Sequence, residues 1–313
     1  MRRSNLRWSL GAVMAGVALA TGIATPAAAA GASVRYVTYD VPGYAGATFL
    51  NGVNNKGDLA GFVFDATGGS HGFIVRNGAV TVFDYPGTSG ATIVQGMNNS
   101  DALSGFYTDA SGVNHAFVRS PQGTFVAINA PGAGTASGQG TIAYGINDAG
   151  VVTGHIIDSA GVDHGFQDKN GTFTTFDDPA AGTSSGEGTR GANTTDSGAI
   201  VGYYTDSANV FYSFVDNNGT FSNFSVPGAG TVPGAGTVAF SISDNGRVIA
   251  GQVTPNDLGT DSFLLIGGQF TQLDDPNAAP ESTGEQAMDS QGDEVVGGYF
   301  DSSGNVHGWI GYF

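Results

Sequence analysis

The chain contains no cysteine and few cations. The lack of cysteine excludes disulfides, thiolate nucleophiles and cysteine metal sites. Only 10 Lys and Arg stand against 27 Asp and Glu, which gives a net charge of −17. Such a balance argues against binding to nucleic acid or to an anionic membrane surface. After residue 30, no stretch stays apolar for the roughly 18 residues that a membrane helix needs, so we expect no membrane span.

Residues 1–30 have the pattern of a secretory signal peptide. Three arginines near the N-terminus are followed by an apolar stretch and by small residues at 28–30, which suit cleavage. Removing this segment leaves seven cations against 27 acids, a net charge of −20. We therefore predict a secreted or periplasmic bacterial protein whose folded part is a single domain, residues 31–313.

The composition favours an all-β protein. Glycine accounts for 52 residues and charged residues for only 12%. Turn-forming residues are thus abundant, whereas the charged residues that favour helices are scarce.

A pattern recurs six times at intervals of 44 to 49 residues. It consists of an Asp and, six residues later, a His followed by a small residue and an aromatic one. Four copies keep both the Asp and the His: Asp65 with His71, Asp109 with His115, Asp158 with His164, and Asp301 with His307. Two copies have diverged, at residues 206–214 and 255–263. A fixed period of this length indicates one supersecondary unit stacked six times.

Each unit is expected to form four short strands, which we call A to D. Strand A ends at a Gly-apolar-Asn step such as Gly52-Val53-Asn54, and a tight turn leads to strand B. The Asp opens the next turn, and the His begins strand C. Strand D stops at a proline, which cannot continue a ladder. Four strands in about 45 residues are typical of a β-propeller blade.

The ends of the folded part predict how the ring closes. The last unit stops after its strand C, at Phe313, while residues 34–42 resemble a strand D with no unit before it. The N-terminal strand can therefore complete the sixth blade and leave no open edge. We predict an all-β, six-bladed β-propeller of four-stranded antiparallel blades, closed by the N-terminal strand.

The repeat resembles the HAF repeat of bacterial extracellular proteins. The Gly-x-Asn-x-x-Gly…His-Ala-Phe pattern carries the resemblance over residues 34–313, and His115-Ala116-Phe117 is the naming triplet. The family is defined by its repeat, and the resemblance implies no specific activity. Some similar proteins end in a sorting tail with a Pro-Glu-Pro motif, whereas this chain ends at Gly311-Tyr312-Phe313, which implies release from the membrane.

Two other architectures compete with the propeller. A β-solenoid or a pair of sandwiches would also suit a repeat of short strands. An outer-membrane barrel would suit a terminal Phe, but its strands need about 9–11 residues, and turns here come too often.

The four Asp–His pairs resemble acid–base dyads, because a carboxylate can orient an imidazole for catalysis. An active site is single, however, and this pair occurs in four blades. We interpret the pairs as structural: the Asp caps its turn and the His donates to it. We predict no metal site and no cofactor, since the equivalent pairs lie far apart and phosphate-cradling loops are missing.

Departures from the repeat are better functional candidates. Arg190 is the only charged residue at its aligned position in the six strands A, and Glu285 is the only one at the next position. Glu187 lies in the loop just before the strand A that carries Arg190, and His155 is the only His outside the repeat position, at the start of strand B where other blades have Phe62, Phe106, Tyr203, Gln252 and Gly298. Glu187, Arg190 and Glu285 are candidate ligand-binding residues at the mouth of the channel, and Glu187, Glu285 and His155 are candidate catalytic residues. The plainer interpretation is solvated charges at strand ends and a packed His.

Two functions follow from these candidates. The preferred one is a secreted, non-enzymatic binding or scaffold module with a polysaccharide or protein ligand, acting as a monomer. The alternative is a glycan-active hydrolase or lyase, which would need two carboxylates about 5–9 Å apart in one pocket.

Overall fold

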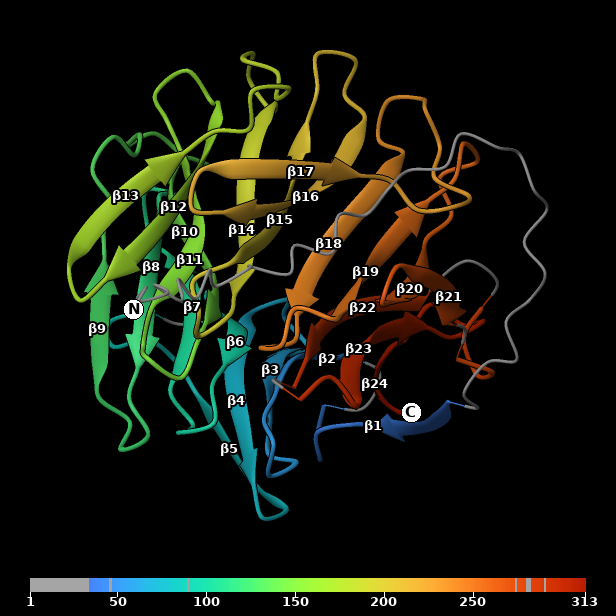
Figure 1. The fold of residues 1–313 in the computed structure, drawn as a ribbon. Coiled ribbons are helices and arrows are strands. Elements are labelled where there is room, and N and C mark those ends of the chain that lie inside the picture. The colour runs from blue at the N-terminus through green and yellow to red at the C-terminus, as the bar shows by residue number, and fades with distance from the viewer. Residues whose placement is uncertain (1–33, 45–46, 89, 274, 280–282, 290) are drawn as a thin grey trace, which may run out of the picture. The chain divides into compact units, whose positions relative to one another are not determined.

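A computed structural model describes residues 34–44, 47–88, 90–273, 275–279, 283–289 and 291–313. In these residues the chain forms 24 strands, arranged as six blades around a ring (Figure 1). The six-bladed propeller predicted from the repeat is therefore confirmed. The signal segment predicted for residues 1–30 lies outside the described residues.

Every blade is an antiparallel sheet in the order A, B, C, D. Blade 1 consists of β2 (Thr48–Val53), β3 (Leu59–Phe64), β4 (Ser70–Arg76) and β5 (Ala79–Phe83). Blade 2 consists of β6 (Thr92–Met97), β7 (Leu103–Thr108), β8 (Asn114–Arg119) and β9 (Phe125–Ile128). Blade 3 consists of β10 (Gly140–Ile146), β11 (Val152–Ile157), β12 (Asp163–Lys169) and β13 (Thr172–Phe176). Blade 4 consists of β14 (Gly188–Thr194), β15 (Ile200–Thr205), β16 (Phe211–Asn217) and β17 (Thr220–Phe224). Blade 5 consists of β18 (Gly236–Ile242), β19 (Val248–Thr254), β20 (Asp261–Ile266) and β21 (Gln269–Leu273). Blade 6 consists of β22 (Thr283–Met288), β23 (Glu294–Phe300), β24 (Val306–Tyr312) and the N-terminal strand β1 (Arg35–Tyr39).

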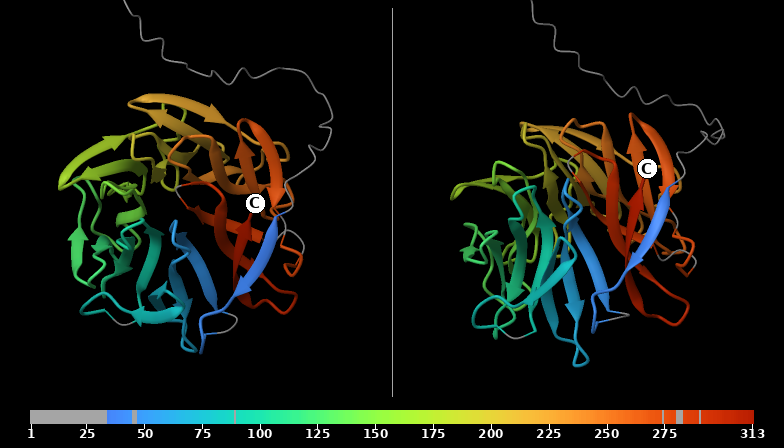
Figure 2. Two further views of the ribbon diagram at one scale, coloured as in Figure 1. Left: turned by 60° about the horizontal axis from the view of Figure 1, so that its bottom comes forward. Right: turned by 90° about the horizontal axis from the view of Figure 1, so that it is seen from below.

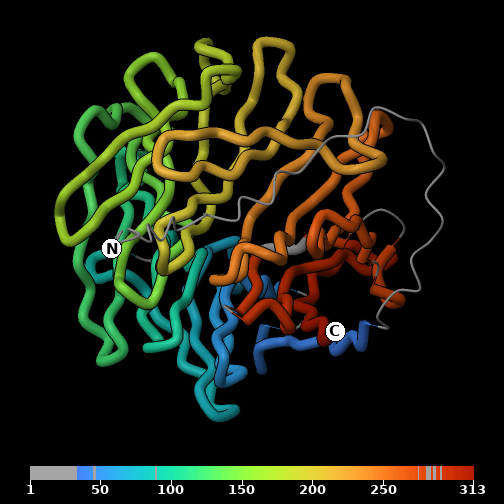
Figure 3. The backbone as a smooth tube through the Cα atoms, viewed as in Figure 1, coloured from blue at the N-terminus to red at the C-terminus, as the bar shows by residue number. Residues whose placement is uncertain are grey.

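The N-terminal strand closes the ring. β1 pairs antiparallel with β24, from Arg35 opposite Tyr312 to Tyr39 opposite Gly308. In Figures 2 and 3 this blue strand lies beside the red C-terminal strands. The predicted closure is thus confirmed.

The aromatic residue of each repeat forms the core of its blade. These six side chains are fully buried: Phe73, Phe117, Phe166, Phe214, Phe263 and Trp309. The residue before each aromatic is small because strand D covers it. A Cβ on Gly165, for example, would lie 2.3 Å from the ring of Phe176. The repeat therefore encodes packing within the blade.

Hydrogen bonds fasten each blade to the next. A buried Thr near the start of strand A accepts the backbone N–H of the residue before the proline that ends the previous strand D. The acceptors are Thr48, Thr92, Thr141, Thr189 and Thr237. At the other end of the strands, a chain of bonds passes between A–B turns: the N–H of Asn55, Asn99, Asp148 and Asp196 donates to the side chain of Asn99, Asp148, Asp196 and Asp244 in turn. These contacts add to the short parallel bridges that join strand C of one blade to the start of strand A of the next.

We call the end of the ring with the A–B and C–D turns the turn face, and the end with the B–C turns and D–A loops the loop face. The A–B turns close on one polar residue in each blade: side-chain oxygens of Asn54, Asn98, Asn147, Thr195, Ser243 and Asp289 accept backbone N–H groups of their own turns. Such Asx and Ser/Thr turns need no other support.

One B–C turn contains a strained residue. Leu258 has φ of 67° at a position where the other turns have Gly68, Gly112, Gly161, Asn209 and Gly304, all with positive φ. A left-handed conformation costs an ordinary L-residue about 1–2 kcal/mol. Since the Leu258 side chain is exposed, packing does not explain the strain.

Replacing Leu258 with glycine should raise the free energy of unfolding by about 0.5–1 kcal/mol. The gain is smaller than the relieved strain, because glycine loses about 0.5–1 kcal/mol more backbone entropy on folding. Urea unfolding measures the change. The matched reverse variant is Gly68→Leu, at the equivalent position of blade 1. A Cβ at Gly68 would contact no other atom, so only the positive φ of 86° disfavours leucine there. Equal stability of Leu258→Gly and the unmodified chain would show that the turn is not strained.

Candidate functional site

Six cross-strand pairs stand at one level around the channel, each joining strands A and B of a blade. They are Phe49 with Phe62, Ile93 with Phe106, Ile142 with His155, Arg190 with Tyr203, Val238 with Gln252, and Gly284 with Gly298. The sequence aligns Arg190 with Phe49, Ile93, Ile142, Val238 and Gly284 of the other strands A, and His155 with Phe62, Phe106, Tyr203, Gln252 and Gly298 of the other strands B; the register confirms both alignments. Within this level, blades 3 and 4 differ chemically because they hold His155 and Arg190.

Arg190 lies between two blades and binds an acid of the preceding one. Its Nε donates to Oδ2 of Asp163 at 2.6 Å, and its Nη2 lies 2.5 Å from the same oxygen. Nη1 donates to the Tyr203 hydroxyl at 3.0 Å. Asp163 is 2% exposed, and burial raises the pKa of its carboxyl although the charge and hydrogen bond of Arg190 lower it. The guanidinium is thus committed to holding blades 3 and 4 together.

His155 is enclosed beside this pair. It is 2% exposed, its ring stacks on Tyr144 with centroids 5.6 Å apart, and Nε2 lies 3.8 Å from Oδ1 of Asp163. Burial, and then the charge of Arg190, lowers the pKa of His155 well below its usual value. The imidazole is therefore neutral, and Nδ1 has no hydrogen-bond partner among the described residues. No external substrate reaches the ring without opening the blades.

The structure describes the side chain of only one of the two candidate carboxylates, Glu187 and Glu285. Glu187 is 6% exposed, and its Oε2 accepts the N–H of Ser184 at 2.8 Å, which closes its own D–A loop. Glu285 pairs with Gly297 through the backbone of β22, and its side chain lies outside the described residues. Glu187 therefore serves its loop, whereas Arg190 turns to Asp163 and Tyr203.

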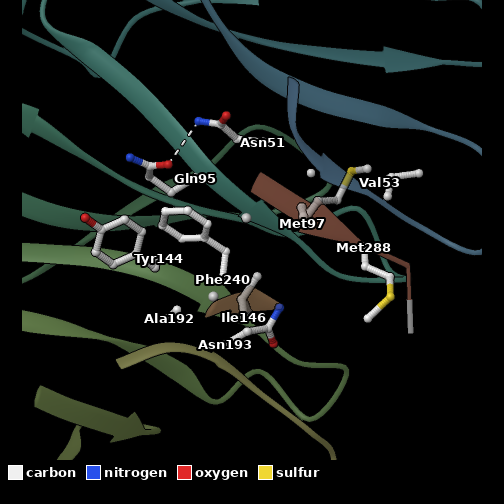
Figure 4. A pocket seen from close by; sticks show the side chains of 14 residues that line it. Asn51, Val53, Gln95, Met97, Tyr144, Ile146, Ala192, Asn193, Phe240 and Met288 are labelled. Carbon is white, nitrogen blue, oxygen red and sulfur yellow. Dashed lines mark hydrogen bonds between the residues drawn. The ribbon is translucent and has the colours of Figure 1, made fainter. Parts of the chain in front are cut away.

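A β-bulge in every strand A narrows the channel. The register shifts once between Leu50 and Gly52, and again at the equivalent point of the other five blades. In Figure 4, Asn51, Gln95, Tyr144 and Phe240 project from these bulges, and Asn51 donates to Gln95 at 2.9 Å. The space open to water-sized molecules is about 20 Å³ here and about 40 Å³ nearer the turn face. One water needs ~10–15 Å³, so each of these two cavities admits one or a few waters but not a sugar.

The Asp of each repeat closes its B–C turn. One carboxylate oxygen accepts the N–H groups two and four residues on; Asp65, for example, binds Thr67 and Gly69 at 2.8 and 2.9 Å. The equivalent acceptors are Asp109, Asp158, Asp206 and Asp301. Hydrogen bonds lower the pKa of all four carboxyls: those of Asp65 and Asp301 chiefly through the side chains of Thr67 and Asn305, and those of Asp109 and Asp158 chiefly through backbone N–H groups.

Each repeat His bridges two acceptors, of which the sequence argument recognised one. Nε2 faces the Asp of the B–C turn, at 3.2 Å for His71 and Asp65. Nδ1 faces a residue at the end of strand D: Asp84 for His71, Asn129 for His115, Asp177 for His164 and Asp40 for His307. The missed signal is an Asp or Asn two residues before the proline that ends strand D.

Three of these histidines have a raised pKa. Burial lowers the pKa of His71, His164 and His307, but hydrogen bonds and charges from two carboxylates outweigh it. A raised pKa means that the stabilisation is complete below about pH 6.5, the unfolded value, and is lost as the pH rises through the folded value.

Asp84→Asn should therefore destabilise the protein more at pH 5.5 than at pH 8.5. The change removes one carboxylate from His71 but keeps an acceptor, as Asn129 does in blade 2. Asn129→Asp should have the opposite effect, a gain that is larger at pH 5.5. Each difference is about 0.2–1 kcal/mol, because these pairs are partly exposed. Urea unfolding at both pH values measures it, and comparison with the unmodified chain cancels contributions from buried groups such as His155. A pH-independent difference would contradict the ionic role of the second carboxylate.

Within the described residues, no cluster of three His, Cys, Asp or Glu side chains has a geometry suited to a metal ion. The search of those residues for a helix long and apolar enough to cross a membrane found none.

Comparison with known proteins places the fold. No protein-family model matches the chain, and no curated protein matches it by sequence. TolB from Acinetobacter baumannii is similar in structure, with a TM-score of 0.51 and 11% identity over 81% of this chain. A putative TolB from Agrobacterium tumefaciens has a TM-score of 0.52 and 14% identity, covering 85% of this chain and 91% of that one. A lectin of Aleuria aurantia, described as a six-bladed β-propeller, has a TM-score of 0.48 and 13% identity over 88% of this chain and 90% of the lectin.

At these identities the likeness shows the fold alone. The chain spans 63% of the length of the Acinetobacter TolB.

Proposed function

We propose that this protein is a non-enzymatic binding or scaffold module that acts outside the cytoplasm and binds an extracellular or envelope polysaccharide. We also infer that it belongs with the HAF-repeat proteins that its sequence resembles. One observation carries the proposal: the candidate residues whose side chains the structure describes are already committed within the fold. His155 is enclosed, the Glu187 carboxylate closes its loop, and Arg190 is bound to Asp163.

The dimensions of the channel support the same conclusion. A catalytic site for a sugar has to admit the sugar, and the space beside Tyr144 is large enough only for water-sized molecules. Binding would then use the outer surface, where the loop face repeats one arrangement of Asp and His from blade to blade. A polymer with a repeating unit can use equivalent contacts several times, and linked contacts raise avidity without any new kind of bond. This repetition favours a polysaccharide as the ligand.

A glycan array and a polysaccharide-cleavage assay on the protein without residues 1–30 test the proposal. We expect binding without turnover. Glu187→Gln is the matched variant, because an amide oxygen still accepts the Ser184 N–H while the acid is lost. Turnover that disappears in this variant would overturn the proposal and support the alternative, a glycan-active hydrolase or lyase. If the protein shows neither binding nor turnover, a polysaccharide ligand is contradicted, and a structural scaffold remains.

A further inference from the structure

Two exposed phenylalanines mark one sector of the loop face. Phe64 is 38% exposed and Phe300 is 48% exposed, and each is the last residue of a strand B, in blades 1 and 6. The equivalent residues of blades 2 to 5 are Thr108, Ile157, Thr205 and Thr254. Blades 1 and 6 are neighbours, because the propeller closes between them (Figure 2). The two phenylalanines therefore lie at the ends of adjacent strands B on the loop face.

A row of four paired backbone positions connects Phe64 with Phe300. The N–H of Phe64 donates to the carbonyl of Ala47 at 3.0 Å, Ala47 forms a parallel bridge with Val306, and Val306 pairs with Phe300. Residues paired across a ladder point to the same side, so Phe64 and Phe300 stand on one side of this row. Three strand spacings separate them by roughly 14 Å. This span exceeds one sugar ring and suits an extended chain.

Further aromatic surface adjoins Phe64. Phe49 and Phe62 stack in parallel with centroids 4.6 Å apart and planes at 5°, and Phe64 meets both edge-on. Gly298 stands where blades 3 and 4 have His155 and Tyr203, and a Cβ on it would lie 3.3 Å from the ring of Phe49. The missing side chain leaves the partly exposed Phe49 ring uncovered on that side. We call Phe49, Phe62, Phe64 and Phe300 the aromatic patch.

The charge around the patch selects its partner. Asp65 and Asp301 follow Phe64 and Phe300 directly, and Asp84 and Asp40 complete the bridges through His71 and His307. Six of the seven cations after residue 30 lie at the turn face, in A–B turns, at the ends of strands C or at the start of β1: Arg35, Lys56, Arg76, Arg119, Lys169 and Arg247. The seventh, Arg190, is neutralised by Asp163. An anionic ligand is therefore repelled and a cationic one attracted.

We propose that the aromatic patch, with its flanking carboxylates, binds a polysaccharide that carries free amino groups. An ammonium group within about 6 Å of an aromatic face is attracted to the ring, and a neighbouring carboxylate adds a charge-assisted hydrogen bond. The apolar faces of the sugar rings cover the phenylalanines. This inference rests on the proposed polysaccharide binding and names the class of polysaccharide and the place where it binds.

The same charges would attract a basic peptide, but the sugar fits better. Immobilising a lysine side chain costs about 1.5–2 kcal/mol of rotamer entropy. An amino sugar holds its ammonium group directly on a rigid ring and avoids most of that cost. It also repeats the cation along the chain, as the loop face repeats the carboxylate.

The test uses glucosamine oligomers of six units, with the fully N-acetylated oligomers of equal length as the neutral form. Isothermal titration of the protein without residues 1–30 should show binding of the amino form at least tenfold tighter than binding of the acetylated form. Phe64→Thr with Phe300→Thr should weaken it at least tenfold; threonine is the residue of blades 2, 4 and 5 at this position, so the fold is preserved. Val126→Thr, at an exposed site on the outer strand β9, is the control and should change nothing.

A pair of charge variants separates local recognition from net charge. Asp40→Asn with Asp84→Asn removes two carboxylates beside the patch, and Asn129 shows that an amide keeps the bond to His. Asp148→Asn with Asp196→Asn removes the same charge at the turn face, where Asn99 already fills the equivalent role. Only the first pair should weaken binding, by at least fivefold.

Equal weakening by both charge pairs, or equally tight binding of hexalysine, would overturn the inference. Array binding of neutral glycans alone would also overturn it but leave the proposed function intact. If no glycan of any charge binds, both this inference and the proposed polysaccharide binding are wrong.

Discussion

Replacing Arg190 with alanine should lower the free energy of unfolding by about 3–5 kcal/mol at pH 7. The change strands the Asp163 carboxylate, which is almost fully buried and whose Oδ2 takes both guanidinium contacts. An uncompensated buried charge costs several kcal/mol, far more than an exposed ion pair is worth. Urea unfolding measures the loss. It should shrink as the pH falls, because a protonated Asp163 needs no cation.

Two further variants distinguish a stranded charge from lost packing. Arg190→Met combined with Asp163→Leu removes both charges and should recover most of the loss, since a buried ion pair replaced by apolar groups of similar volume is often neutral. Tyr203→Phe removes only the hydrogen bond from Nη1 and should cost about 1 kcal/mol. A loss below 1 kcal/mol for Arg190→Ala, or no recovery in the double variant, would contradict the role of the pair as the link between blades 3 and 4.

The sequence predicted the level of these residues but not their partners. Period and turn chemistry align Arg190 with Phe49 and His155 with Phe62, because both alignments follow from the strand register that the repeat enforces. Asp163 is adjacent to His164 in the repeat and therefore looks like an ordinary variable position. Its contact with Arg190 crosses from one blade to the next, and a pattern confined to one repeat carries no information on which side chains meet across that boundary.

The narrow channel was also beyond the sequence. A β-bulge adds one residue to strand A without disturbing the spacing of the Gly-apolar-Asn step, so a fixed period hides it. The bulge turns Tyr144 and Phe240 toward the channel, two positions further along strand A than the level of Arg190 at which the sequence placed a ligand pocket. The second acceptor of each His, by contrast, was present in the sequence as the Asp or Asn before the proline. The sequence pattern did not reveal this acceptor, because in strand D only the proline that ends the strand was interpreted.

Deleting residues 31–43 should lower the melting temperature by more than 10 °C and shift the fluorescence of Trp309 to the red. The deletion removes β1 and with it all five paired positions along β24, so a blade edge becomes exposed. It also removes the buried Val41 side chain. A loss above about 4–5 kcal/mol lowers the melting temperature of a domain this size by more than 10 °C.

Trp309 reports directly on this closure because it is the only tryptophan after residue 30. Its ring is fully buried, its Nε1 donates to the Gly284 carbonyl at 3.0 Å, and the Tyr36 ring of β1 lies 5.6 Å away. Adding a synthetic peptide of residues 31–43 should restore both emission and melting temperature, because the vacated edge still presents its ladder groups. Asp40→Asn within the full chain is the control, since it keeps the strand and should leave the emission unchanged. A truncated protein with unaltered emission and melting temperature would show that β1 does not hold the ring closed.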